Sequence, residues 1–149
     1  MTRVGFYHLT RSSLEQALPK LLERALAAGN RCQILCGSPE RVAALDSLLW
    51  TYDPDSWLPH GQAREGQAES QPVWLTATDE NPNRADVLVL IDGMTSDRMN
   101  SYARCLDLFD GGDETAVAAA RSRYKAAKEA GFDLEYWQQD EKSGWKRAQ

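Results

Sequence analysis

The chain has 149 residues, of which 42% are apolar and 26% are charged. This length suits one domain with one core, and this composition excludes a disordered, collagen-like or disulfide-scaffold chain. Lysine and arginine number 17 against 22 acidic residues, so the net charge is −5 and a phosphate backbone repels the molecule as a whole. A direct role in binding nucleic acid therefore needs a local basic patch.

Strands and helices are expected to alternate along the chain. β-Branched and aromatic residues over 4–9 predict a strand, and the cap residues of 10–13 precede apolar positions at spacings of three and four, which predict a helix that Gly29 ends. The same signals predict strands over 31–36, 72–76, 86–92 and 105–109 and helices over 39–50, 97–103 and 114–130.

The order of these elements predicts the fold class. Residues 51–71 lack periodicity and indicate a long irregular connection, while the strand over 86–92 is apolar on both faces, as in a central parallel strand. Alternating strands and helices are typical of a three-layer α/β fold with an open, mostly parallel sheet. We expect a single domain of this kind over residues 1–149.

Neither a membrane segment nor a metal site is predicted. The longest apolar run, Val87–Ile91, is too short to cross a bilayer, and the first residues lead into a strand instead of a signal-peptide core, so we expect a cytoplasmic protein. The spacing between Cys32 and Cys36 is longer than in zinc or redox pairs, and Cys105 stands alone. With only two histidines in the chain, the sequence predicts buried thiols and no metal or cofactor.

Signals for catalysis are weak. The turn over 10–13 has no glycine for a phosphate loop, and no nucleotide-binding motif occurs elsewhere. Asp92, at the end of the central strand, is the basis of an alternative in which the protein is a small hydrolase or nuclease that uses Mg²⁺ held with Asp53 or Asp55. A second alternative pairs Cys36 with His60 for nucleophilic catalysis.

The last predicted helix carries a basic stripe. Arg121, Tyr124, Lys125 and Lys128 follow one another at helical spacing, so three cations and one aromatic ring share a surface. Composition alone favours a solvated, charge-rich helix end as the explanation, but in an acidic chain the stripe is also the best candidate for binding an acidic partner. The basic helix and the five tryptophans of the chain are the basis of a third alternative, direct binding of nucleic acid.

The opposite side of that helix is rich in alanine. Small residues let a helix lie close to a sheet, and we expect Ala116, Ala119, Ala120, Ala127 and Ala130 to form this face. Arg123 adjoins them, and its stem is expected to extend out to solvent.

Two tryptophans mark a further surface. Trp50 ends the second helix and Trp57 lies in the long connection, followed by Pro59 and His60. Aromatic residues at a loop edge often dominate protein interfaces, although these two could equally fix the connection to the core.

Several of these segments together resemble the chi subunit of bacterial DNA polymerase III holoenzyme, a clamp-loader accessory subunit. The resemblance rests on 6–7, 45–50, 56–60, 86–89, 121–125 and 130–132. It implies a Rossmann-like fold without a nucleotide site and a non-catalytic adaptor. Such subunits bind the acidic C-terminal tail of single-stranded-DNA-binding protein and, through another surface, the psi subunit or a repair helicase.

The resemblance also implies roles for individual residues. Arg121 would take the α-carboxylate of the tail, Tyr124 its terminal side chain, and Lys125 with Lys128 the upstream acids. Phe109 and Val117 would form apolar walls. Either Trp137 or Trp145 would be the aromatic that packs on the tail, and Trp137 is the preferred candidate. The psi or helicase side would use Trp50, Trp57, Pro59 and His60. Val117 stands where the family can have a lysine. Lys128 would then compensate for the positive charge that is missing at position 117.

Overall fold

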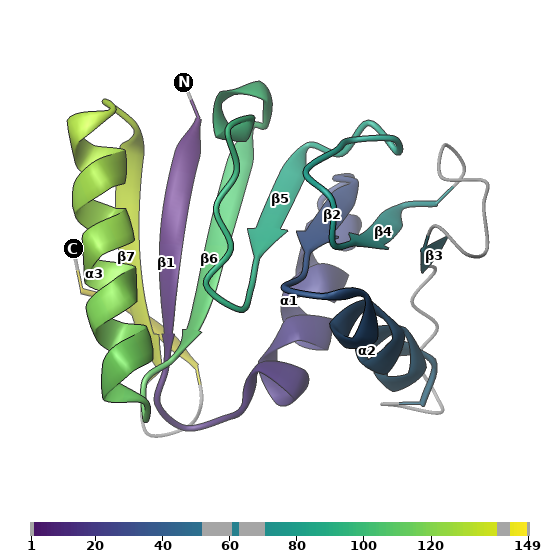
Figure 1. The fold of residues 1–149 in the computed structure, drawn as a ribbon, viewed down its shortest axis with the longest axis horizontal. Helices are drawn as coiled ribbons and strands as arrows, with labels where there is room; N and C mark the ends of the chain where they lie inside the picture. Colours follow the sequence, from purple (N-terminus) through teal and green to yellow (C-terminus); the bar gives the residue numbers. More distant parts are fainter. Residues whose placement is uncertain (1, 52–60, 63–70, 140–143, 149) are drawn as a thin grey trace.

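The computed structural model describes residues 2–51, 61–62, 71–139 and 144–148. Within them, eight strands form one sheet in the order β3-β4-β2-β5-β6-β1-β7-β8 (Figure 1). Neighbouring strands are parallel except for the antiparallel pair β7–β8. The strands are β1 (Arg3–Leu9), β2 (Cys32–Leu35), β3 (Gly61–Gln62), β4 (Val73–Thr76), β5 (Val87–Leu90), β6 (Arg104–Asp110), β7 (Asp133–Gln139) and β8 (Trp145–Arg147).

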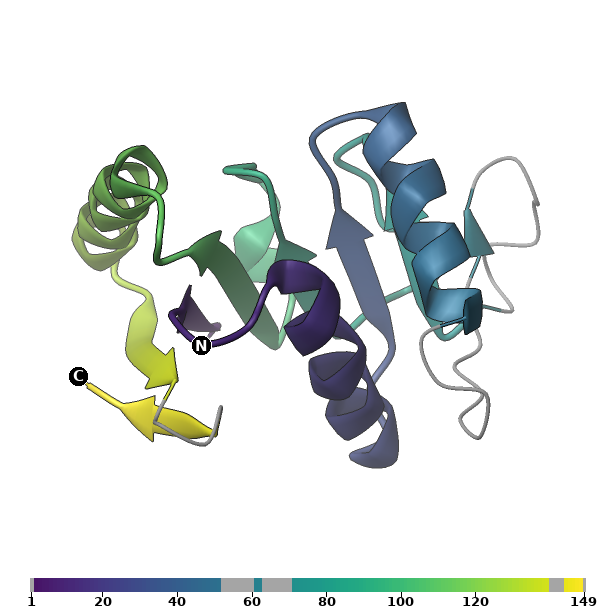
Figure 2. The ribbon, with the colours of Figure 1, turned by 90° about the horizontal axis from the view of Figure 1, so that it is seen from below.

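Helices cover both faces of the sheet, which confirms the expected three-layer α/β fold. The helices of the described residues are α1 (Leu14–Ala27), α2 (Pro39–Thr51) and α3 (Glu114–Glu129), together with a 3-10 turn, η2 (Met99–Ser101). Leucines of α1 and α2 belong to one buried cluster, whereas alanines of α3 belong to the cluster on the other face. Seen along the sheet, α1 and α3 lie on opposite sides of it (Figure 2).

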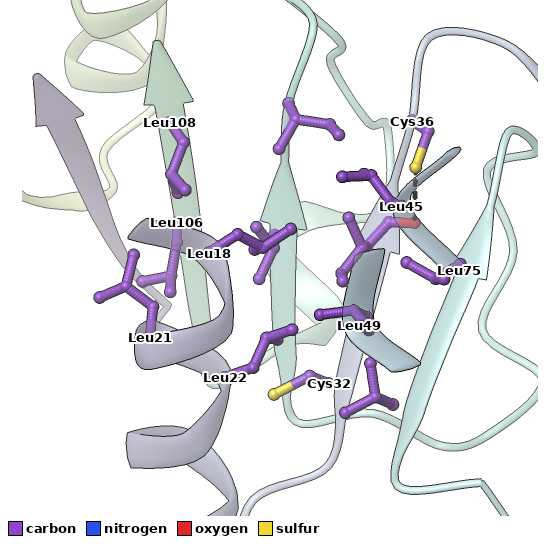
Figure 3. Close-up of a cluster of buried hydrophobic side chains, with 14 of the residues drawn as sticks. Leu18, Leu21, Leu22, Cys32, Cys36, Leu45, Leu49, Leu75, Leu106 and Leu108 are labelled. Carbon is purple, nitrogen blue, oxygen red and sulfur yellow. Dashed lines mark hydrogen bonds between the residues drawn. The ribbon is translucent and has the colours of Figure 1, made fainter. Parts of the chain in front are cut away.

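The core under α1 and α2 follows the predicted periodicity. Leu18 and Leu22 of α1 and Leu45 of α2 are fully buried (Figure 3). The first turn of α1 is closed by a capping box, in which Ser13 Oγ accepts from the Gln16 backbone N–H and Gln16 Oε1 accepts from that of Ser13.

The central strand is confirmed. All four residues of β5 are buried, and β5 pairs in parallel with β2 on one side and β6 on the other. A strand with neighbours on both edges and helices or loops on both faces needs apolar side chains at every position.

The helix expected over 97–103 is wrong, because only η2 forms there. The backbone N–H groups of Asp97 and Arg98 bond to the side chains of Asp79 and Ser96 instead of entering a helix. Tyr102 is 2% exposed and its backbone is extended, so its burial ends the turn after one step. So short a segment has no helical stability of its own.

Strand β7 was not expected. Its alternation places Leu134 and Tyr136 against the α3 side and Trp137 against the α1 side. Glu135, which is buried although charged, interrupts the apolar signal that would have indicated a strand.

Cys32, Cys36 and Cys105 are buried free thiols, as predicted. Among the described residues, no three histidine, cysteine or acidic side chains gather as a metal site would require. In the same part of the chain, no helix has the length and apolar character needed to cross a membrane.

Candidate functional site

Helix α3 presents the predicted basic stripe to solvent. Asp113 caps the helix, since its Oδ1 accepts from the N–H groups of Thr115 at 2.9 Å and Ala116 at 3.2 Å. Ala120 and Ala127 are buried against the sheet, which lets the helix lie close to it. Of the expected alanine face, Ala116 is half-buried, while Ala119 and Ala130 are exposed, so that part of the expectation is wrong.

We call Arg121, Tyr124, Lys125 and Lys128 the basic ridge. Its three cations are exposed, and Tyr124 is half-buried. No ion pair joins Arg121, Lys125 or Lys128 to an acidic group among the described residues. The positive charge of the ridge is therefore available to a partner.

Arg123 behaves differently from the ridge, and the expectation that it extends to solvent is wrong. Its side chain is 14% exposed and turns toward β6, where Nε and Nη2 donate to the two oxygens of Asp107 at 2.7 and 3.0 Å. The inward stripe of α3 thus carries one arginine, which neutralises a buried acid of the sheet.

An aromatic cluster supports the ridge from below. The ring of Tyr124 meets Phe6 edge to face at 5.3 Å and Tyr136 at 6.1 Å, and Tyr136 also lies 6.2 Å from Phe109. These rings come from α3, β1, β7 and β6. Edge-to-face rings have little freedom to move, so Tyr124 is held in place beside Arg121.

His8 joins this cluster, and sequence analysis missed both His8 and Tyr136. The hydroxyl group of Tyr136 and Nδ1 of His8 are 2.8 Å apart, and the His8 ring lies 5.0 Å from that of Phe109. Burial lowers the pKa of His8, and the positive charge of Arg121 lowers it further. A hydrogen bond with the backbone of Gly111 acts in the opposite direction and raises the pKa. A polar residue at the end of a buried strand was the available signal for His8.

The two expected apolar walls lie beneath the ridge. Phe109 is 5% exposed, and Val117 is half-buried against the same cluster. Phe109 therefore supports the other rings and offers little surface of its own.

Trp137 does not lie with the ridge. It packs against Tyr7 in the cluster on the α1 side, with ring centroids 6.3 Å apart and nearly parallel planes. Adjacent side chains of a strand point to opposite faces, so its neighbour Tyr136 occupies the place expected for Trp137.

The tryptophan surface is described only in part. Trp50 belongs to the last turn of α2, on the face of the sheet opposite α3. Trp57, Pro59 and His60 lie outside the described residues, as do Asp53 and Asp55.

A cavity of about 760 Å³ lies where parallel α/β sheets usually bind their ligands. It opens at the carboxyl ends of β1 and β6, between the first turns of α1 and α3. However, the backbone N–H groups of Thr10, Arg11 and Ser12 all donate to Oε1 of Gln139, at 3.0, 2.8 and 3.0 Å. A side chain of β7 thereby occupies the donors that a phosphate would use.

Asp92 and Cys36, the residues on which the two catalytic alternatives depend, are both in environments that suit a structural role. Asp92 Oδ2 accepts from the Gly37 N–H at 3.0 Å, and Oδ1 accepts from Arg41 Nε at 3.2 Å. Burial raises the pKa of the Cys36 thiol to about 12, so it is protonated near neutral pH and a poor nucleophile.

Comparison with known proteins gives a consistent result. The family model of the DNA polymerase III chi subunit, HolC, matches residues 1–135. DNA polymerase III subunit chi of Escherichia coli is 28% identical over 124 residues, which are 83% of this chain and 84% of that protein. Subunit chi of Pseudomonas aeruginosa is 28% identical over 139 residues, or 91% of this chain and 95% of that protein. The probable subunit chi of Rickettsia prowazekii is 31% identical over 91 residues, which cover 61% of this chain and 55% of that relative.

Proposed function

The chain belongs to the DNA polymerase III chi subunit family, and from this premise we propose that it is a non-catalytic adaptor whose basic ridge binds the acidic C-terminal tail of single-stranded-DNA-binding protein. Family membership makes it an accessory subunit in DNA replication. Arg121, Lys125 and Lys128 are exposed and form no ion pair with any described acidic group, and they lie above an aromatic cluster; this observation supports the proposed partner.

Each ridge residue suits one part of such a tail. Arg121 can form a bidentate contact with the terminal carboxylate, because its guanidinium has no acidic partner among the described residues. Tyr124 offers an aromatic edge beside it for the terminal side chain. Lys125 and Lys128, about one and two turns further along α3, suit upstream acids.

This arrangement favours weak, reversible binding. Exposed charge contacts contribute about 0–1 kcal/mol each and weaken with salt, so we expect micromolar affinity dominated by the carboxylate and the terminal side chain. A tail bound in this way is readily exchanged during replication.

The adaptor role includes a second partner. We infer that the surface around Trp50, Trp57, Pro59 and His60 contacts the psi subunit of the clamp loader or a repair helicase. Because α2 and α3 cover opposite faces of the sheet, a partner bound at Trp50 would leave the ridge open. Because both proposed partners act where bacterial DNA is replicated, we also propose a cytoplasmic location.

We also infer that the protein has no catalytic activity of its own. Asp92 uses both carboxylate oxygens to hold the turn after β2, and the Cys36 thiol is protonated at neutral pH. Neither residue is prepared for the chemistry that the hydrolase or nuclease alternative requires. Mg²⁺-dependent hydrolysis that Asp92→Asn abolishes would contradict this inference.

A peptide titration tests the tail site. A fluorescein-labelled acidic peptide that ends in Ile-Pro-Phe should bind saturably, and Arg121→Ala should raise its Kd by about tenfold, equivalent to about 1.4 kcal/mol. Arg98→Ala removes the same charge from an exposed position elsewhere and should change Kd by less than about twofold, the size expected of a remote surface charge.

A second peptide isolates the contact with the terminal carboxylate. Amidation of the peptide should weaken binding to the native protein, and Arg121→Ala should then cost little more, because both changes remove one interaction. Absence of saturable binding, or equal affinity of native protein and Arg121→Ala, would refute the tail site.

A further inference from the structure

The face of the sheet away from the basic ridge carries a second hollow, between α1 and the strand pair β7–β8. Figure 2 shows α1 and β8 on the side opposite α3. Two adjoining cavities, of about 320 and 550 Å³, share Leu21, Arg24 and Trp145 in their walls. We call them together the α1–β8 groove.

The groove has an aromatic floor. Trp137 stacks beside Tyr7 at 6.3 Å, and Trp145 meets Tyr7 edge to face at 5.0 Å. Tyr7 is buried, whereas both tryptophans are only half-buried, with Leu21 of α1 across from them. Apolar surface that is fixed and partly open is what a partner's side chain can cover.

The same wall holds hydrogen-bond donors that the described residues leave unused. Trp137 Nε1 and Arg104 Nε are both buried and have no hydrogen-bond acceptor among those residues. Buried N–H groups without an acceptor cost stability, and a carbonyl or carboxylate group brought in by a partner would relieve that cost once the side chains that cover these two atoms move aside. The donors favour an occupant that is rich in acceptor oxygens.

The charge of the groove favours an acidic occupant. Its walls include the cations Arg11, Lys20 and Arg24, against one acid, Glu15. Arg104 also lines the groove, but it is paired with Glu135 at 3.7 Å and adds little net charge. Glu15 is already bound to Arg41, at 2.9 Å. The groove is therefore positive in a chain whose net charge is −5.

An acidic protein segment fits better than a nucleic acid. Bases bind by stacking on open ring faces, but the Trp137 ring is stacked with Tyr7 and Trp145 abuts Tyr7. The acidic chain also repels a polyphosphate as a whole. A segment with carboxylates around one apolar side chain meets the cations, the donors and the aromatic floor at once.

We propose that the α1–β8 groove is a second docking site, which binds an acidic protein segment bearing an apolar side chain independently of the basic ridge. The site lies on the face opposite the ridge, so occupation of one leaves the other accessible. The proposal does not depend on the tail-binding function, because none of its residues belongs to the ridge.

A blocked peptide tests the groove separately from the ridge. The probe is acetyl-Asp-Glu-Asp-Leu-Phe-Asp-Glu-amide, which has no terminal carboxylate for Arg121 to bind. Titration into the ¹⁵N-labelled full chain should shift the indole N–H signals of Trp137 and Trp145, assigned with Trp137→Phe and Trp145→Phe. The same peptide with Asn and Gln in place of its acids should cause no saturable shift.

Charge reversal provides the matched comparison. Arg24 is an exposed residue of the groove wall. The substitution Arg24→Glu should weaken peptide binding by about tenfold. Arg98→Glu makes the same reversal elsewhere, and Arg121→Ala alters only the ridge, so both should bind the peptide as the native chain does. Lys20→Glu is a second groove variant, in case Arg24→Glu does not fold.

Three outcomes would overturn the proposal. The first is saturable binding that Arg24→Glu and Lys20→Glu leave unchanged. The second is tighter, Arg24-dependent binding of an oligothymidylate, which would assign the groove to single-stranded nucleic acid. The third is a concentration-dependent dimer in sedimentation that Arg24→Glu abolishes, which would assign the groove to a second copy of the chain.

Discussion

Arg123 reaches from α3 to Asp107 on β6 and binds both oxygens of its carboxylate. Asp107 is 3% exposed, and burial raises its pKa while Arg123 opposes that rise. The pair joins the helix that carries the basic ridge to the centre of the sheet. The pair also distinguishes Arg123 from Arg121, two positions earlier on the same helix, because Arg123 faces the core and Arg121 faces solvent.

Removing one partner of this pair should destabilise the fold. Arg123→Ala leaves the Asp107 carboxylate buried without its cation, and we expect a loss of about 3–5 kcal/mol in the free energy of unfolding. Urea unfolding followed by circular dichroism measures it. The double variant Arg123→Met with Asp107→Leu should recover much of the loss, and Arg121→Ala should change stability by less than about 0.5 kcal/mol. Equal losses for Arg121→Ala and Arg123→Ala would contradict the assignment.

Gln139 should matter to the start of α1 although it lies on β7. Its Oε1 accepts three backbone N–H groups of the turn over 10–12, and its Nε2 donates to Ser12 Oγ at 2.6 Å. Gln139→Ala leaves these donors to water and should cost about 1–3 kcal/mol. Gln139→Glu keeps an acceptor in place and should cost less. Faster hydrogen exchange at Thr10–Ser12 in Gln139→Ala, with little change elsewhere, would localise the effect.

His8 should report the charge of the ridge. Burial lowers its pKa and Arg121 contributes, so Arg121→Gln should raise the pKa of His8 without restoring the ordinary value of about 6.5. A carboxylate bound at Arg121 should act in the same direction. Proton NMR titration of the imidazole, with His8→Gln for assignment, measures both effects, and an unchanged His8 signal in Arg121→Gln would contradict them.

The same lowered pKa predicts how stability depends on pH. Below about 6.5 the unfolded chain protonates this histidine more readily than the folded chain does, so the stability that neutral His8 supports is lost as pH falls through that range. As the pH is lowered from 7 to 5, the urea midpoint should therefore decrease more steeply for the native protein than for His8→Gln. Parallel curves would count against this contribution.

The three thiols should react slowly in the folded protein. Burial raises the pKa of Cys32, Cys36 and Cys105 to about 12, so almost no thiolate is present at neutral pH. Ellman's reagent should modify all three on unfolding in urea and none rapidly beforehand. Fast modification of Cys36 in the native state would reopen the nucleophile alternative.

Local patterns in the sequence predicted the features that depend on local spacing. The buried face of α1, the capping residue Ser13, the central strand β5 and the outward stripe of α3 all follow from periodicity or cap chemistry. These features need no knowledge of which distant segment lies nearby. The exposed positions of Arg121, Lys125 and Lys128 belong to this group.

Features that depend on distant partners were not predicted. Arg123 turns inward because Asp107 lies beneath it, and nothing in α3 itself indicates that acid. Trp137 faces α1 because of the register of β7, a strand whose pattern Glu135 obscures. The contact between Gln139 and the turn over 10–12 joins segments more than 120 residues apart, so only the folded structure reveals it.

Strand β1 has both of its neighbours late in the chain, since Arg3 pairs with Arg104 on one side and Asp133 on the other. During synthesis on the ribosome, β1 emerges long before either neighbour exists, so its pairing with β6 waits for residues 104–110 and its pairing with β7 waits for residues 133–138. Parallel pairing across such separations is slow. The aromatic cluster and the groove both use side chains of β1 and β7, so neither can be complete before these two strands have paired.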